Sequence, residues 1–146
     1  MATGLQRLVR RKVLALLKAD SELTGLVPAA RIYSQAAAAD PAWPFIKLGA
    51  PTTLRLRAAG VNGGAVSFDV HAFARARESG GQEVETAEDH CGRIGAQIER
   101  VLADNRIALD GGEIVKLALS DMQLLQDEDP GAFHYLCQVN ARVLAA

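Results

Sequence analysis

The 146-residue sequence predicts an α+β fold: a mostly antiparallel sheet with two helices packed on one face and a long protruding β-hairpin. In two separate stretches apolar residues recur at spacings of three and four, which is typical of amphipathic helices. Elsewhere apolar and polar residues alternate with a period of two, which is typical of half-buried strands. The predicted order is helix, short strand, hairpin, helix, hairpin. We find no internal repeat and no linker, so we expect one domain over residues 1–146.

The first helix begins near the N-terminus and presents a basic arc opposite its apolar stripe. Asp20 is placed to cap a short helical turn over residues 21–26, and Pro28 ends that turn. The stripe consists of Leu5, Leu8, Val9, Val13, Leu16 and Leu17, and the arc of Arg7, Arg10, Arg11 and Lys18.

The second helix is longer and follows the glycine pair at 80–81. On its outer face Asp89 and Arg93 are four residues apart, which predicts a modest ion pair. Its apolar stripe consists of Val84, Ala87, Cys91, Ile94, Ile98, Val101 and Leu102.

The strand candidates are separated by glycine and proline. Residues 45–57 alternate in two pieces broken at Gly49 and Pro51, which predicts a bent or bulged edge strand. Residues 58–64 have the composition of a turn, and the alternating stretch at 65–77 completes a long hairpin. Shorter signals are a strand at 31–35, a proline-containing loop at 36–44 and a closing pair of strands joined by the acidic turn at 127–131.

Composition excludes several classes of protein. Sixteen Lys and Arg against 17 Asp and Glu give a net charge of −1, so no overall positive charge indicates binding to nucleic acid or anionic lipid. The apolar stretches are far shorter than the roughly 20 residues that a membrane-spanning helix needs. Charged residues interrupt the N-terminal stretch, whereas a secretory signal has a continuous apolar core. Cys91 and Cys137 fit no disulfide or metal spacing. We therefore expect a soluble protein of a reducing cytoplasm with no membrane partner.

His71 is the most suggestive single residue. Alternation places Phe68, Val70, Ala72 and Ala74 on one face of the strand, and Asp69, His71, Phe73 and Arg75 on the other. Asp69 is placed to orient an imidazole for base catalysis, but no nucleophile lies in a recognisable motif. We interpret His71 as a structural or interface residue.

The remaining candidates have simpler interpretations. His134 and Cys137 are three apart on a strand and so point to opposite faces, while Cys91 lies on the apolar stripe of the second helix and His90 is rotated away from it. The glycine pairs at 63–64, 80–81 and 111–112 match no phosphate-binding loop, and the acidic turn is too short for a calcium loop. The arginines of the first helix, with Arg55 and Arg57, carry no interleaved aromatics and indicate nucleic acid only weakly. We predict no catalytic residue, no metal and no cofactor.

The layout of segments resembles a known family. The RIY at 31–33 is followed by WPFIKLG at 43–49, and FDVHAF at 68–73 is followed by a glycine-containing turn, a helix and a closing strand pair. Over nearly the whole chain this is similar to the tail terminator or tail completion proteins of long-tailed bacteriophages, prophages and gene transfer agents. The stretch AAAAD at 36–40 departs from the pattern and leaves the loop there undefined.

The resemblance implies a virion structural protein, made in the bacterial host cytoplasm, that forms a ring, a hexamer, at the head-proximal end of the tail tube. The ring would end tail polymerisation and present the head-joining surface. Its implied partners are further copies of itself, the major tail tube protein and head–tail connector proteins, while DNA passes through the lumen without specific recognition. Implied contact residues are Arg55, Arg57, Asn62, Gly63, His71 and Arg75, with the hairpin tip at 58–64 ordered on a neighbouring subunit.

Two alternatives remain open from the sequence. Another neck component, such as a head–tail connector subunit, fits the same residues. A small ligand-binding domain or enzyme would instead require a cleft on the open side of the sheet, with polar groups such as Asp69, His71 and Tyr135 converging in it.

Overall fold

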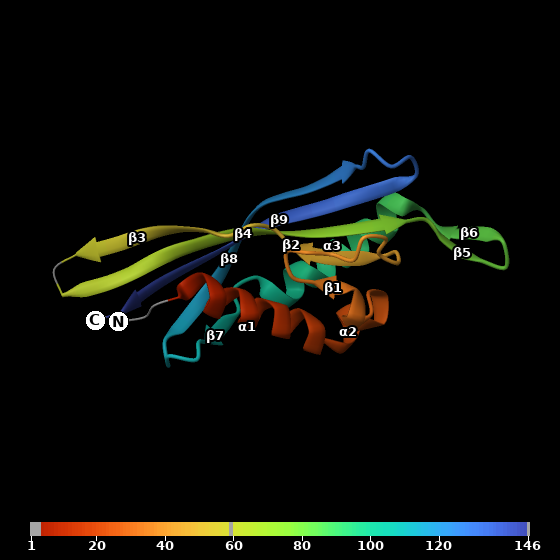
Figure 1. The fold of residues 1–146 in the computed structure, drawn as a ribbon. Helices are drawn as coiled ribbons and strands as arrows, with labels where there is room; N and C mark the ends of the chain where they lie inside the picture. Colours follow the sequence, from red (N-terminus) through yellow and green to blue (C-terminus); the bar gives the residue numbers. More distant parts are fainter. Residues whose placement is uncertain (1–3, 59, 146) are drawn as a thin grey trace.

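The computed structural model describes residues 4–58 and 60–145. Its helices are α1 (Leu5–Ala19), α2 (Ser21–Leu26), a 3₁₀ turn at Ala29–Arg31, and α3 (Ala87–Leu102) (Figure 1). Its strands are β1 (Ile32–Tyr33), β2 (Phe45–Leu48), β3 (Thr52–Ala58), β4 (Val61–Arg75), β5 (Arg77–Ser79), β6 (Gln82–Glu85), β7 (Arg106–Ala108), β8 (Ile114–Gln126) and β9 (Ala132–Ala145).

One seven-stranded sheet has the order β1-β2-β4-β9-β8-β7, and β3 also pairs with β4. Only β1 and β2 run parallel among its pairs; the others are antiparallel. The parallel pair joins the two sequence segments RIY and WPFIKLG, since Ile32 lies opposite Ile46 and Tyr33 opposite Lys47. The predicted α+β class with a mostly antiparallel sheet is confirmed.

The long strand β4 organises the sheet. One of its edges pairs with β9 from Asn62 to Arg75, and its other edge pairs first with β3 and then with β2. Between these two partners, residues 49–51 face only residues 68–69, so one extra residue bulges out. A Cβ atom at Gly49 would lie 3.3 Å from the Asp69 carbonyl oxygen and from His71 Nε2, which favours glycine at this bend. The predicted break at Gly49 and Pro51 is confirmed, but of β2 and β3 only β3 is an edge strand, because β2 lies between β1 and β4.

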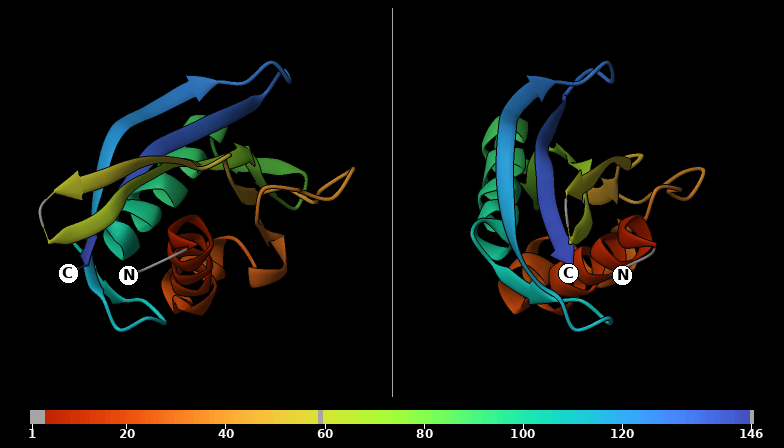
Figure 2. Two further views of the ribbon diagram at one scale, coloured as in Figure 1. Left: turned by 60° about the vertical axis from the view of Figure 1, so that its left-hand side comes forward. Right: turned by 90° about the vertical axis from the view of Figure 1, so that its left-hand side faces the viewer.

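Both long helices and α2 lie on the same face of the sheet, which curls around them (Figure 2). We call this the helix face and the opposite one the open face. Alternation along β4 and β9 supplies the sheet side of the core, and i, i+4 spacing along α1 and α3 supplies the helix side. Its fully buried members include Val9, Val13, Leu17, Ile94, Ile98, Val66, Val70, Ala72, Cys137 and Val139.

The long hairpin projects beyond the helices (Figure 1). We call its outer part the arm: Thr52–Ala58, Asn62–Ala65 and Arg142–Leu144, which form three adjacent strands. The predicted turn at 58–64 is wrong in extent, because β4 already begins at Val61 and residues 62–64 are paired on both sides. Gly60, with φ of 75°, is a turn residue, and Ala59 lies outside the described residues.

A second correction concerns the segment before α3. The glycine pair at 80–81 does not release the chain into the helix; it forms the turn of a separate two-stranded hairpin, Arg77–Glu85, which we call the finger. Both glycines have positive φ, 62° and 80°, as a two-residue hairpin turn requires. Val84 therefore belongs to β6 and is 52% exposed, and α3 begins at Ala87 after the cap residue Thr86.

Tight packing of α3 on the sheet depends on a missing side chain. Gly95 is buried in the middle of α3, facing the Tyr135 ring of β9. A Cβ atom at Gly95 would lie 2.5 Å from Tyr135 Cδ2, closer than van der Waals contact permits. A Cβ atom at Gly92 would lie 3.6 Å from Leu124 Cδ2, which is ordinary contact.

We therefore expect opposite effects from two substitutions in the same helix. Gly95→Ala should lower the free energy of unfolding by about 1–3 kcal/mol through overpacking, despite the better helix propensity of alanine. Gly92→Ala should raise it by about 1 kcal/mol, because only the propensity changes. Urea denaturation measures both, and a stabilised Gly95→Ala would contradict this packing.

Candidate assembly surface

The two faces of the arm differ in chemistry. Paired residues share a face, so Leu54, opposite Ala65, and Leu144, opposite Gly63, lie on the open face. Leu54 is 68% exposed and Leu144 is 53% exposed. Arg55 and Arg57 lie on the other face, the one that carries the helices further along the sheet. The arm thus presents Arg55 and Arg57 on one face, and the exposed leucines together with Arg142, which pairs with Ala65, on the other.

The predicted contact residues of the arm are divided between these faces. Asn62 pairs with Arg57 and lies on the basic face, whereas Gly63 lies on the apolar face. A side chain at Gly63 would collide with the Val143 carbonyl of β9, so the glycine permits close strand packing. The sequence interpretation missed the exposed leucines, although the alternation LRLR at 54–57 already places them opposite the arginines.

His71 and Arg75 lie on the open face of β4, as predicted, but both have partners within the chain. The Arg75 guanidinium stacks over the Trp43 ring at 4.2 Å and forms an ion pair with Asp129 in the β8–β9 turn. His71 Nδ1 lies 2.8 Å from Nε2 of His134 on β9. His134 sits diagonally across the β4–β9 ladder from His71, so only the register of two strands 63 residues apart brings them together.

The centre of the open face is polar and internally satisfied. Ser67 Oγ donates to Asn140 Oδ1 (3.0 Å), and Asn140 Nδ2 donates to Ser120 Oγ (2.9 Å). Ser120 Oγ in turn donates to Gln138 Oε1 (3.2 Å). These side chains form one chain of hydrogen bonds across three strands.

The histidine pair shares one proton between its facing nitrogens. Burial lowers the pKa of His71 from its ordinary value of 6.5, with a smaller opposing effect from Asp69. Burial first, and His71 second, lower the pKa of His134. Two positive imidazoliums at this separation would repel, and one nitrogen of the pair must stay unprotonated to accept the hydrogen bond.

Acidification should therefore destabilise the chain in a histidine-dependent way. With folded-state pKa values below 6.5, the contribution of the pair is present above pH 6.5 and is lost as the pH falls through the lowered values. Urea denaturation at pH 7.5 and at pH 5.5 measures the free energy of unfolding. Its decrease between the two pH values should be smaller for His134→Gln than for the unmodified chain. An equal decrease in both proteins would exclude the histidine pair as the source of the acid sensitivity.

The residues considered for metal or enzyme chemistry do not converge. His134 faces the open side, whereas Cys137 is fully buried on the helix face, as predicted. Burial raises the pKa of each thiol, Cys91 and Cys137, to about 11. In the described part of the chain no three His, Cys, Asp or Glu side chains gather as a metal site would require. Tyr135 packs on α3, on the face opposite Asp69 and His71, so the three groups that the ligand-binding or enzyme alternative requires do not converge.

His90 corrects another prediction. It is not rotated away from the core but is 4% exposed in the first turn of α3. Its Nδ1 donates to the Arg75 carbonyl oxygen at 2.7 Å, and this hydrogen bond compensates the burial of the imidazole. Thus His90 ties the start of α3 to the end of β4.

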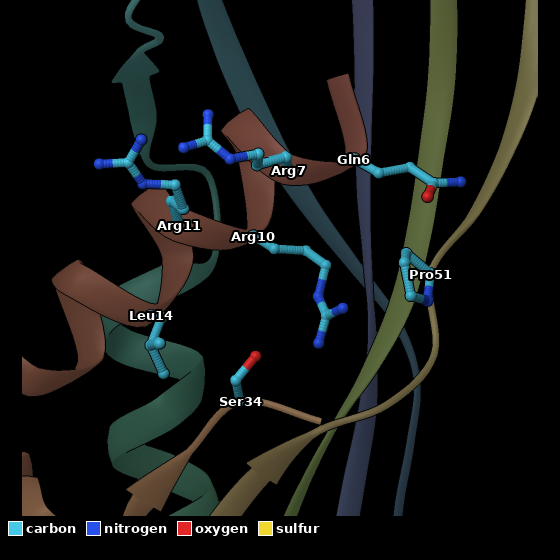
Figure 3. A pocket seen from close by; sticks show the side chains of 7 residues that line it. All are labelled: Gln6, Arg7, Arg10, Arg11, Leu14, Ser34 and Pro51. Atoms are coloured by element: carbon cyan, nitrogen blue, oxygen red, sulfur yellow. The ribbon is translucent and has the colours of Figure 1, made fainter. Parts of the chain in front are cut away.

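A basic pocket of about 310 Å³ lies between α1 and the β2–β3 connection, at the root of the arm (Figure 3). The Arg10 side chain extends across it toward Ser34, while Arg7 and Arg11 follow its rim on α1. The Arg10 guanidinium also lies 5.7 Å from the Phe68 ring centroid. Its Nε and Nη2 are buried and have no acceptor among the described residues, and burial lowers the pKa of Arg10.

The finger is fastened to the fold mainly by one carboxylate. Arg93 of α3 donates two hydrogen bonds to Glu85, at 2.8 and 2.9 Å, and Arg77 donates a third at 3.0 Å. These contacts, Arg93 first, lower the pKa of Glu85 to about 2. The predicted partner of Arg93 was Asp89; Glu85 takes that position because the finger returns the chain beside α3. An isolated two-stranded hairpin is marginal in water, so this anchor matters.

Removing the charge at Glu85 should loosen the finger without unfolding the core. We expect Glu85→Gln to raise hydrogen exchange of the amides at 78–85 by roughly tenfold, because three charge-assisted hydrogen bonds are weakened, including the two from Arg93 that join the finger to α3. Glu88→Gln, at an exposed carboxylate in the first turn of α3, is the matched control and should leave these amides unchanged. In the unmodified chain the protection should hold above pH 4.5 and be lost as the pH falls toward about 2.

A curled sheet from which an arm and a finger project is typical of a subunit that contacts other chains. The comparisons with known proteins place it more closely. A model of the family described as tail completion protein gp17 matches residues 11–144. The chain belongs to this family, and it is a phage tail structural protein. The resemblance seen in the sequence is confirmed.

A solved structure has the same fold. A chain in the structure entitled "Virion of native gene transfer agent (GTA) particle" superposes with a TM-score of 0.78 and 17% identity, covering 99% of this chain and 100% of that one. At this identity the likeness establishes the fold alone. No curated protein sequence matches the chain. None of the helices in residues 4–58 and 60–145 is long and apolar enough to span a membrane.

Proposed function

We propose that this chain, as one domain over residues 1–146, forms a closed ring at the head-proximal end of the tail tube. The ring, a hexamer, stops the addition of tube subunits and presents the surface to which the head connector joins. It acts by shape and contact, without turnover. Membership of the tail completion family carries this proposal.

The shape of the subunit supports a ring. A ring needs a heterologous interface, in which one surface of a subunit contacts a different surface of the next. The arm and the finger project from different ends of the fold (Figure 1), which gives each subunit two unlike contact regions. The exposed Leu54 and Leu144 give the arm an apolar side to bury.

The proposed partners follow from the same role. They are further copies of the chain, the major tail tube protein and the head–tail connector proteins, met in the virion after synthesis in the host cytoplasm. DNA would pass through the lumen without sequence recognition, which agrees with a net charge of −1. Arg55, Arg57, Asn62 and Gly63 are the proposed contact residues on the arm; His71 and Arg75 would act from the open face beside it.

Arm variants test the proposal. With the neighbouring tail tube gene coexpressed, Arg55→Ala/Arg57→Ala should weaken ring formation roughly thirtyfold, because two lost charges at about 1 kcal/mol each sum to about 2 kcal/mol. Arg106→Ala, an exposed arginine on β7, is the control and should cap tubes normally. Negative-stain images of tube ends and tube lengths give the readout.

The outcomes separate the parts of the proposal. If the double variant caps tubes as well as the unmodified chain does, the arginine face of the arm is not an interface. If the unmodified chain binds neither itself nor tube ends, the ring proposal fails. If it binds only isolated connectors, it is another neck component.

A further inference from the structure

The finger carries two opposed negative charges. Glu78 lies directly across the hairpin from Glu83, and both side chains are exposed. Like charges directly opposite each other destabilise a strand pair. Within the described chain neither carboxylate forms an ion pair, because Arg77 and Arg93 are engaged with Glu85. The finger therefore holds an acidic pair that lacks a cation.

The basic pocket has the complementary deficiency. Within residues 4–58 and 60–145 the buried Nε and Nη2 of Arg10 have no acceptor, and buried donors without a partner cost stability. Arg7 adds positive charge at the rim, and Arg11 is held only loosely by Asp110 at 3.6 Å on the exposed surface. A carboxylate entering this pocket would satisfy the Arg10 donors in their bidentate geometry.

We propose that the acidic pair of the finger, Glu78 and Glu83, docks into the Arg10 pocket of an adjacent copy of this chain. This inference rests on the proposed ring and names its contact. The finger projects from the end of the molecule opposite the arm, whereas the pocket lies at the root of the arm (Figures 1 and 3). The contact is thus between copies and heterologous, as ring closure requires.

The finger fits this role better than the other acidic element at its end of the fold. In the β8–β9 turn Asp129 is already paired with Arg75. The finger has a two-glycine tip, which offers no side chain to obstruct entry into a pocket. Glu78 and Glu83 would be stabilised by docking, since a shared cation relieves their repulsion.

Charge variants test the contact in the coexpressed tube-capping assay. Glu78→Gln/Glu83→Gln should weaken ring association roughly tenfold or more, while the melting temperature of the free subunit stays equal or rises, because the repulsion is removed. Arg10→Met, which retains packing on Phe68, should have the same effect on the ring. Arg10→Glu should abolish capping, and Arg10→Glu combined with Glu83→Arg should restore it. Glu128→Gln, in the β8–β9 turn, is the control.

A cross-linking experiment is independent of capping. A chain with Arg10→Cys and Glu83→Cys, treated with a short bismaleimide, should give a ladder of covalent oligomers. A linker is needed because these long side chains hold their Cα atoms farther apart than a disulfide allows. Native Cys91 and Cys137 are buried and should not react. Arg10→Cys with Glu128→Cys should give monomers.

The results distinguish this contact from the ring itself. Rings that survive both finger substitutions, with no ladder, would overturn the docking and leave the ring proposal intact. If the variant with Arg10→Cys and Glu128→Cys gives the ladder instead, the β8–β9 turn and not the finger makes the contact, and the finger assignment is overturned. If the chain binds short duplex DNA, Arg10→Glu abolishes that binding and Glu83→Arg does not restore capping, the pocket binds phosphates. This result would also overturn the docking. Restored capping in the Arg10→Glu/Glu83→Arg variant, together with the ladder of covalent oligomers, would support the docking.

Discussion

The paired strands β4 and β9 are the element on which the rest of the fold depends. Their continuous ladder, from Asn62–Ala145 to Arg75–Ala132, buries one face against the helices over most of its length. Because side chains alternate strictly, a shift of one residue would turn Val70 and Cys137 outward and Asp69 into the core. The register is therefore strongly fixed, and every other feature takes its place relative to it.

The ladder is longer than the helix layer that covers it, and this mismatch produces the arm. Beyond α1 these strands continue beside β3, with the exposed Leu54 and Leu144 on the open face and Arg55 and Arg57 on the other. At the opposite end the chain leaves β4 into the finger, held by Glu85 and Arg93. The exposed leucines and the exposed acidic pair lie at these two projecting ends, which suits a subunit whose partners are other proteins.

Much of the candidate surface lay beyond sequence reasoning for identifiable reasons. The alternation at 54–57 places Leu54 opposite the arginines, but only the tertiary structure decides which of the two faces the helices cover. The His71–His134 contact depends on a register across 63 residues. Arg10 looked like one member of a solvated basic arc; only the packing of α1 beside the β2–β3 connection buries its guanidinium nitrogens. Glu78 and Glu83 were hidden because the glycine pair between them also resembles a helix start.

Local periodicity by itself determined the α+β class, α1, the capped turn at Asp20, the bulge near Gly49, the acidic β8–β9 turn and the two faces of β4, because each depends on neighbours within a few residues. The order of those segments was sufficient for the tail completion family. Tertiary structure alone decided the bounds of the arm, the existence of the finger, the burial of His90 and the opposite orientation of Tyr135. These depend on strand register and on which helix covers which stretch of sheet, and such long-range geometry leaves no periodic trace in the chain.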